Sequence, residues 1–220
     1  MKNRLIEKLP VPERNYLLKY SVPAELVAGD QLCLARQPIK HVYFPLDGVI
    51  AQTMLHHGSP TLQLSLVGNE GMLGATLLLG IEDASTTSVV CCGGGALTMP
   101  ASQFSRALCQ NARLMQTLHQ YLFADMQRWA QSVYCINFHK TKPRLARLLL
   151  MIDERIQDKR VRLTQQMLAS LLGTKESSIS MAAEVFQRQG LIDYQRDQIE
   201  VRSRSRLAEE ACSCFLTSDA

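Results

Sequence analysis

The polar residues best placed to do chemistry lie in the segment 163–192, LTQQMLASLLGTKESSISMAAEVFQRQGLI. Thr164 is a good N-cap for a short helix, and Gly173 can adopt the left-handed conformation that ends it. A second helix is predicted from about Lys175 to Arg188, with Gly190 after it. Its outer positions are all polar, namely Lys175, Glu176, Ser177, Ser180 and Glu184. Such side chains can hydrogen-bond to base edges and phosphates of nucleic acid.

The two helices must share an apolar core if the second helix is to project from the protein surface. Leu168, Leu172 and Ile179 occupy the positions that would form it, and the small Ala169 lies where the helices would cross. This pattern predicts a helix-turn-helix whose second helix enters a major groove, because an ordinary helical corner in a core would have no polar outer face. The candidate DNA contacts are Thr164, Gln165, Lys175, Glu176, Ser177, Ser178, Ser180, Met181, Arg188 and, on a wing, Arg196.

The surrounding C-terminal segment is predicted to be helical with a small β element. Apolar spacing indicates a helix over residues 144–155, and Ile192–Tyr194 and Gln198–Val201 flank a turn that forms the wing. Residues 140–220 carry 14 basic and 11 acidic side chains, a net of +3, against 10 and 9 in residues 1–139. This charge favours a polyanionic partner, although a solvated charged face explains it nearly as well. The shift begins at Lys140, Lys142, Arg144 and Arg147 beside Pro143, which predicts a domain boundary near residues 138–143.

Residues 20–100 have the pattern of a β-sandwich or roll. Short apolar runs separated by turn signals are Val42–Phe44, Val49–Leu55, Leu62–Val67, Ser88–Cys92 and Ala96–Met99. Leu62, Leu64 and Leu66 alternate with other residues, which predicts a strand with one buried face.

A long amphipathic helix is predicted from Asn111 to Ile136, roughly 39 Å at 1.5 Å per residue. It is too long for a small roll to cover, so we expect a second copy of the helix to cover the rest. The expected dimer interface is Leu114, Leu118, Leu122, Met126, Trp129, Val133 and Ile136. The alternative is a helix packed wholly on its own domain.

No catalytic or metal-binding constellation stands out. The seven cysteines include no CxxC, and we interpret most as isolated buried thiols. A thiol or metal role for Cys212 and Cys214 has weak support, and the roles of Cys91 and Cys92 are left open. A metal-dependent jelly-roll enzyme is disfavoured because the adjacent His56 and His57 would point to opposite faces of a strand. We expect no enzyme and no metal.

The order of roll, long helix and LTQQxLAxxLG…SxxS…GLI resembles the Crp–Fnr superfamily of bacterial transcription regulators over nearly the whole chain. YFPLDGVIAQ and GNEGMLGATLLLG resemble the roll of one branch. The resemblance implies an α+β fold: a cyclic-nucleotide-binding-like β-roll (1–110), a dimerisation helix (111–139) and a winged helix-turn-helix (140–220). It implies a homodimer that reads an imperfect palindrome in double-stranded DNA, with RNA polymerase as a further partner of an activator.

The chain departs from that family at its effector residues. Where cyclic-AMP-binding members have a Gly-Glu pair and an Arg-Ser or Arg-Thr pair, this chain has Gly74-Ala75 and Ser85-Thr86-Thr87, and no Arg or Lys lies between Lys40 and Arg106. The cyclic phosphate would lack a charged bidentate partner. We therefore predict that cyclic AMP is not the effector. The degenerate pocket would lie near Gly71, Gly74, Ala75, Ser85, Thr86 and Thr87.

Two further departures concern the cofactor and the operator. Oxygen sensors of the family need several N-terminal cysteines, whereas the first one here is Cys33, so no iron–sulfur cluster is expected. Glu176-Ser177 and Met181 replace the usual Arg-Glu and second Arg, so the target sequence should differ. A constitutive DNA-binding dimer without an effector is the alternative function. The N-terminus has no apolar signal region and no stretch reaches about 18 apolar residues, so we expect a cytoplasmic protein without a membrane span.

Overall fold

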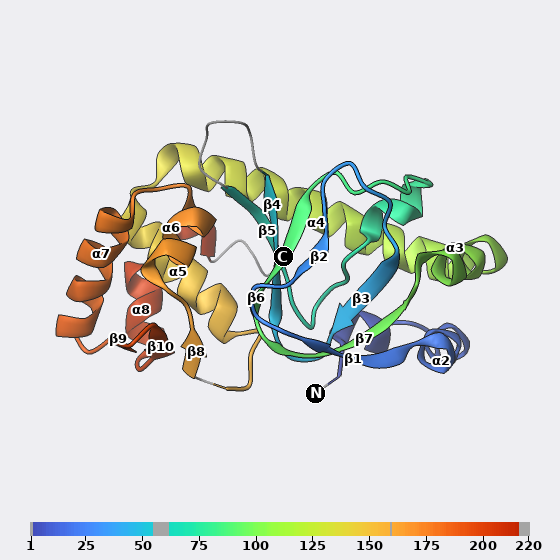
Figure 1. The fold of residues 1–220 in the computed structure, drawn as a ribbon, viewed down its shortest axis with the longest axis horizontal. Helices are drawn as coiled ribbons and strands as arrows, with labels where there is room; N and C mark the ends of the chain where they lie inside the picture. The colour runs from blue at the N-terminus through green and yellow to red at the C-terminus, as the bar shows by residue number, and fades with distance from the viewer. Residues whose placement is uncertain (1, 55–61, 159, 216–220) are drawn as a thin grey trace. The chain divides into compact units, whose positions relative to one another are not determined.

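The computed structural model describes residues 2–54, 62–158 and 160–215. The chain divides into two compact units, residues 1–52 with 66–127 and residues 53–65 with 128–220 (Figure 1). Helices and sheets are mixed, so the predicted α+β class with an N-terminal β region, a long helix and a C-terminal helix-turn-helix is confirmed.

The β-roll has two sheets. Its strands are β1 (Val22–Leu26), β2 (Gln31–Cys33), β3 (His41–Pro45), β4 (Val49–Met54), β5 (Leu62–Val67), β6 (Thr87–Cys92) and β7 (Gly94–Pro100). The sheet orders are β1-β7-β3 and β2-β6-β4-β5. The strands predicted from apolar runs are present, whereas β1 and β2 were not individually predicted. The predicted alternation in β5 is wrong, because Ser65, Leu66 and Val67 are all buried.

Buried apolar side chains form two clusters in the first unit. One cluster comprises Leu26, Ile50, Val67, Leu73, Val90 and Ala96. Around a second, larger cluster lie helices α1 (Arg4–Glu7), α2 (Val11–Tyr20) and α3 (Ala101–Gln110), with the short 3-10 helix η1 (Ala75–Leu79). Phe44 and Phe104, both members of this cluster, meet edge to face, with ring centroids 6.2 Å apart.

The predicted long helix is α4, which runs from Ala112 to Phe138. Asn111 begins it, because its side-chain oxygen accepts a hydrogen bond from the backbone amide of Leu114 at 3.1 Å. The division between the two units falls within α4, between residues 127 and 128. None of the helices in the described part of the chain is long and apolar enough to cross a membrane.

The second unit carries the helices that follow α4. They are α5 (Thr141–Asp153), α6 (Gln165–Leu172), α7 (Glu176–Arg188) and α8 (Arg204–Glu210) (Figure 1). The 3-10 helix η2 (Ser213–Phe215) follows them. Pro143 lies in the first turn of α5, where its missing N–H costs nothing. Only His139 and Lys140 therefore separate α4 from α5.

A three-stranded sheet, β8-β10-β9, forms the wing. It contains β8 (Arg160–Arg162), β9 (Ile192–Gln195) and β10 (Gln198–Val201). Arg196 and Asp197 make the two-residue turn between β9 and β10 with φ of 50° and 63°, as the strand twist of a tight hairpin requires. The predicted wing is present, with β8 and the later helix α8 as unpredicted additions.

Candidate nucleic-acid interface

Local signals define both ends of α6. The hydroxyl of Thr164 accepts a hydrogen bond from the amide of Met167 at 3.0 Å, which satisfies an amide that the helix leaves free. Gly173 ends the helix with φ of 55°, in the left-handed region. Lys175 is the N-cap of α7. The predicted caps and helix bounds are thus confirmed to within one residue.

Buried apolar side chains hold α7 on α6 and α5. Leu168 and Ile179 are fully buried, and Leu172 is 7% exposed, as the sequence predicted for the shared core. Ala182, Ala183 and Phe186 complete the inner face of α7. Because one face of α7 is used in this way, its opposite face must project outward.

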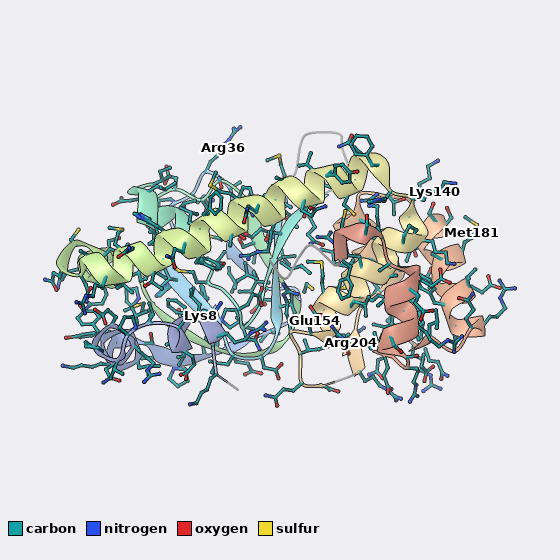
Figure 2. All side chains as sticks on the ribbon, turned by 180° about the vertical axis from the view of Figure 1, so that it is seen from behind. Lys8, Arg36, Lys140, Glu154, Met181 and Arg204 are labelled. Atoms are coloured by element: carbon teal, nitrogen blue, oxygen red, sulfur yellow. The ribbon has the colours of Figure 1, made fainter. Side chains whose placement is uncertain are left out.

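The outward face of α7 carries the side chains that were predicted to contact bases or phosphates. Lys175, Glu176 and Ser177 are exposed at its start, Ser178 and Ser180 are half-buried, and Glu184 and Arg188 are exposed further along. Met181 is 63% exposed and points away from the helix pair (Figure 2). Its thioether is therefore on the same side as the polar groups and is not part of the core.

The remaining predicted contacts flank α7. Thr164 and Gln165 are half-buried at the start of α6, and Arg196 is exposed at the turn of the wing. The hydroxyl of Tyr194 ties the wing to the residues just before α6 by donating to the carbonyl of Leu163 at 2.8 Å. Burial, followed by the charges of Asp197 and Glu176, raises the pKa of Tyr194 to about 12.

The basic stretch at the start of α5 does not contribute a continuous charged surface. Arg144 and Arg147 are each only 8% exposed. Arg144 Nη2 donates to the carbonyl of Leu172, at the C-terminal end of α6, at 2.5 Å. Lys142 forms an ion pair with Glu210 at 2.6 Å. Part of the positive charge that suggested a polyanionic partner is therefore buried within the second unit, where Arg144 supports the end of α6.

The roll positions expected for an effector pocket are crowded. A Cβ added at Gly71 would lie 2.4 Å from the hydroxyl of Tyr121, which donates to the carbonyl of Met72 and accepts from its amide. A Cβ at Gly74 would lie 2.9 Å from Val42. Ala75 begins η1. Of the other three predicted residues, Ser85 is exposed, Thr86 is buried and Thr87 is half-buried.

Part of the predicted dimer interface on α4 is corrected. Leu114 and Leu118 are 1% and 0% exposed in the core of the roll, and Leu122 packs against it. Met126 and Val133 are exposed, and Trp129 and Ile136 are half-buried. The periodic apolar set covers more than one face of the helix, and its first part faces its own unit. Exposed apolar side chains that the prediction missed are Phe123, Tyr134 and Phe138.

Four groups that the sequence did not link meet in the second unit. The sulfur atoms of Cys135, Cys212 and Cys214 and a ring nitrogen of His139 all lie within 4.8 Å of one another. The hydrogen bond with Cys212 is the main influence that lowers the pKa of Cys135, against the opposing effect of burial. Two sequence signals could have indicated this cluster: the CxxxH motif of Cys135 and His139 at the end of a helix, and the CxC motif of Cys212 and Cys214 after α8.

The other cysteines and histidines that the sequence raised are placed elsewhere. Cys91 and Cys92 are buried neighbours whose sulfur atoms lie 3.7 Å apart. His56 and His57, on which the jelly-roll enzyme alternative depended, lie outside the described residues.

Comparison with known proteins agrees with this arrangement. Residues 143–210 match the Crp-like helix-turn-helix domain family. None of the curated proteins is significantly similar to the chain in sequence.

Solved structures resemble the fold over most of the chain. FixK2 from Bradyrhizobium japonicum has a TM-score of 0.73 at 15% identity, over 88% of this chain and 98% of that one. A CRP-family transcriptional regulator from Thermus thermophilus has a TM-score of 0.71 at 16% identity, over 86% and 96%. The c-di-GMP-responsive global regulator CLP of Xanthomonas campestris has a TM-score of 0.67 at 13% identity, over 87% and 99%. Residues 143–210 are therefore a Crp-like helix-turn-helix domain, in a chain that has the fold of the Crp/Fnr transcriptional regulators.

Proposed function

We propose that the protein is a transcription regulator that binds double-stranded DNA as a homodimer and reads an imperfect palindrome. The observation that carries this proposal is the outward face of α7, with Lys175, Ser177 and Met181 exposed above a fully buried Ile179. A helix supported in this way can enter a major groove about 12 Å wide.

This proposal assigns the predicted contacts either to bases or to phosphates. Lys175 reaches a guanine or a phosphate, Glu176 accepts from a cytosine amine, and Met181 contacts a thymine methyl. Ser177, Ser178 and Ser180 contact bases or phosphates. The DNA phosphates are bound by Thr164, Gln165, Arg188 and Arg196 and by the N-terminal amides of the helices, and these contacts position the protein on the duplex. Because the outer face of α7 has no arginine near its start, the operator should differ from the usual family sequence.

The proposed dimer interface is the exposed apolar part of α4. Phe123, Met126 and Val133 are 62%, 61% and 53% exposed, at spacings of three and seven residues, and Tyr134 and Phe138 are 51% and 70% exposed. A helix in water rarely exposes this much apolar side chain unless a partner covers it. A second copy of α4 fits the spacing of such a seam. Sedimentation velocity should give a dimer, and a monomer at micromolar concentration would contradict the proposal.

DNA binding is tested by selecting genomic fragments with the purified protein and footprinting those retained. We expect paired protections about 34 Å, or one helical turn, apart, with related sequences in the two halves. Failure to retain any fragment in dilute buffer would refute the proposal, because low salt strengthens every phosphate contact.

A matched pair of charge reversals makes this test specific. Lys175→Glu, on α7, should abolish binding, because it places a negative charge against the duplex. Lys8→Glu, on the exposed end of α1 in the first unit (Figure 2), makes the same change in net charge and should bind as the original protein does. Equal losses in the two variants would mean that the effect is only one of overall charge.

We infer that the roll does not respond to cyclic AMP. Ala75 cannot accept a hydrogen bond from a ribose hydroxyl, and the segment between Lys40 and Arg106 has no arginine or lysine for the phosphate. Isothermal titration should show no heat of binding. Micromolar affinity for cyclic AMP would overturn this inference.

A constitutive DNA-binding dimer is the second candidate. The buried apolar side chains within the roll, among them Leu26, Ile50 and Val90, favour it. The purified protein would then bind its operator at nanomolar concentration without any addition, and we expect no catalytic activity. If the bound sites adjoin promoters that the protein activates, RNA polymerase is the further partner to test.

A further inference from the structure

The C-terminal end of α4 and the segment after α8 bring together a complete set of soft metal ligands. Cys135 and His139 are four residues apart on α4 and its end, so they lie on one face. Cys212 and Cys214 follow α8, where the amide of Phe215 donates to the carbonyl of Cys212 in a tight turn. Three sulfur atoms and one imidazole nitrogen thus converge from segments 77 residues apart.

The spacing of these atoms agrees with a tetrahedral zinc site. With Zn–S of about 2.3 Å and Zn–N of about 2.0 Å, tetrahedral angles place two sulfur ligands about 3.8 Å apart and a sulfur and a nitrogen about 3.5 Å apart. Here the sulfur atoms of Cys135 and Cys212 are 3.5 Å apart, and Cys214 Sγ is 3.5 Å from His139 Nδ1. A disulfide would need sulfur atoms about 2.05 Å apart.

The surroundings of the cluster differ from those of ordinary buried thiols. Cys135, Cys212 and Cys214 are 3%, 6% and 2% exposed and pack on one another as a separate cluster. A thiol that acts only as a small hydrophobe gains nothing from meeting two others and an imidazole. Three thiolates and a histidine are the donor set of structural zinc sites, whereas Mg²⁺ and Ca²⁺ require oxygen ligands.

Neighbouring groups orient two of the four donors. Gln131 Nε2 donates to Cys214 Sγ at 2.8 Å, which is the kind of outer contact that holds a metal-bound sulfur. The ring of Tyr134 meets His139 edge to face, with centroids 5.8 Å apart. The amide of Cys212 donates to the carbonyl of Pro143 at 3.3 Å, so the tail is also tied to α5.

We propose that Cys135, His139, Cys212 and Cys214 bind one zinc ion in a closed tetrahedral site. The ion would link the last turn of α4 to the segment after α8, across the two-residue connection His139–Lys140. Its role would be structural, because four protein ligands leave no open position for a substrate. The site would hold α5 and the helix-turn-helix against the end of α4 within the second unit.

Metal analysis of the full-length protein, purified under reducing conditions, tests the proposal. We expect one zinc ion per chain. Replacement by Co²⁺ should give the visible absorption bands of a tetrahedral ion and the near-ultraviolet bands of thiolate ligands. Absence of both bound zinc and the cobalt spectrum would overturn the proposal. Iron with acid-labile sulfide, or a Cys135–Cys212 disulfide in the reduced preparation, would also overturn it.

Ligand variants assign the ion to this site. Cys135→Ser and Cys214→Ser should each weaken zinc binding at least 100-fold in competition with a chromophoric chelator. Cys109→Ser removes an exposed thiol outside the cluster and should leave binding unchanged. Because a cysteine variant could fail to fold, His139→Ala provides a second test at a half-buried position. It should shift the cobalt bands while the thiolate bands persist, and an unchanged spectrum would exclude His139 as a ligand.

Discussion

Replacing Arg144 by methionine should destabilise the second unit without removing a DNA contact. The change keeps an apolar stem of similar length and deletes the guanidinium that donates to the carbonyl of Leu172. A hydrogen bond from a charged donor contributes about 1.5–3 kcal/mol, and a cation near a helix C-terminus about 0.3–1 kcal/mol. Arg144 is only 8% exposed, so water cannot fully replace the lost bond. We therefore expect the free energy of unfolding to fall by about 2–3 kcal/mol.

The assay for Arg144→Met is urea denaturation followed through the fluorescence of Trp129, the single tryptophan, which belongs to the second unit. The salt dependence of DNA affinity supplies an independent readout. Because Arg144 faces α6, the slope of log K against log salt should stay unchanged in the variant.

Arg188→Ala is the matched control, with the opposite expectation. Arg188 is 71% exposed and lies 4.0 Å from Glu184, and an exposed pair of this kind contributes about 0–1 kcal/mol. Its loss should reduce the salt slope by about 0.9 if it contacts one phosphate. The reasoning would be refuted if Arg144→Met kept full stability and reduced the salt slope, because Arg144 would then be a phosphate contact.

Three further changes test other parts of the molecule. Lys175→Ala should weaken binding to the operator by about 1–3 kcal/mol and relax specificity at one base pair, whereas an equal loss on all sequences would indicate a phosphate contact. Tyr121→Phe leaves the amide and carbonyl of Met72 without their buried partner and should cost about 1–3 kcal/mol in urea unfolding; unchanged stability would show that these bonds contribute nothing net. Met126→Glu should raise the dimer dissociation constant more than tenfold in sedimentation velocity, and Leu79→Glu, at an equally exposed position in η1, should not.

Much of the fold followed from signals that act over a few residues. Thr164 and Gly173 predicted the ends of α6 because capping and left-handed φ depend on the residue itself and its near neighbours. The buried positions Leu168 and Ile179 followed from the 3.6-residue period. The same period led us to assign too many residues of α4 to the dimer interface, because periodicity identifies an apolar face but not what covers it. Leu114 and Leu118 are covered by their own roll.

The candidate nucleic-acid interface also has features that the sequence could predict and features that it could not. The outward face of α7 was predictable because a helix that buries Ile179 must project Ser177 and Met181 on the other side. The burial of Arg144 was not, because its partner is a backbone carbonyl at the end of another helix, 28 residues away. A basic run looks the same in sequence whether it faces water or a helix terminus.

The amino-acid sequence by itself determined the caps of α6, most strands of the roll and the polar face of the second helix, because those depend on backbone preferences and short periodicity. Only the tertiary structure decided which part of α4 remains exposed and which distant thiols meet. Cys135 and Cys212 are 77 residues apart, and no local preference relates them. Their contact results from the path of α5 to α8, which is set by the packing of all the intervening apolar side chains together.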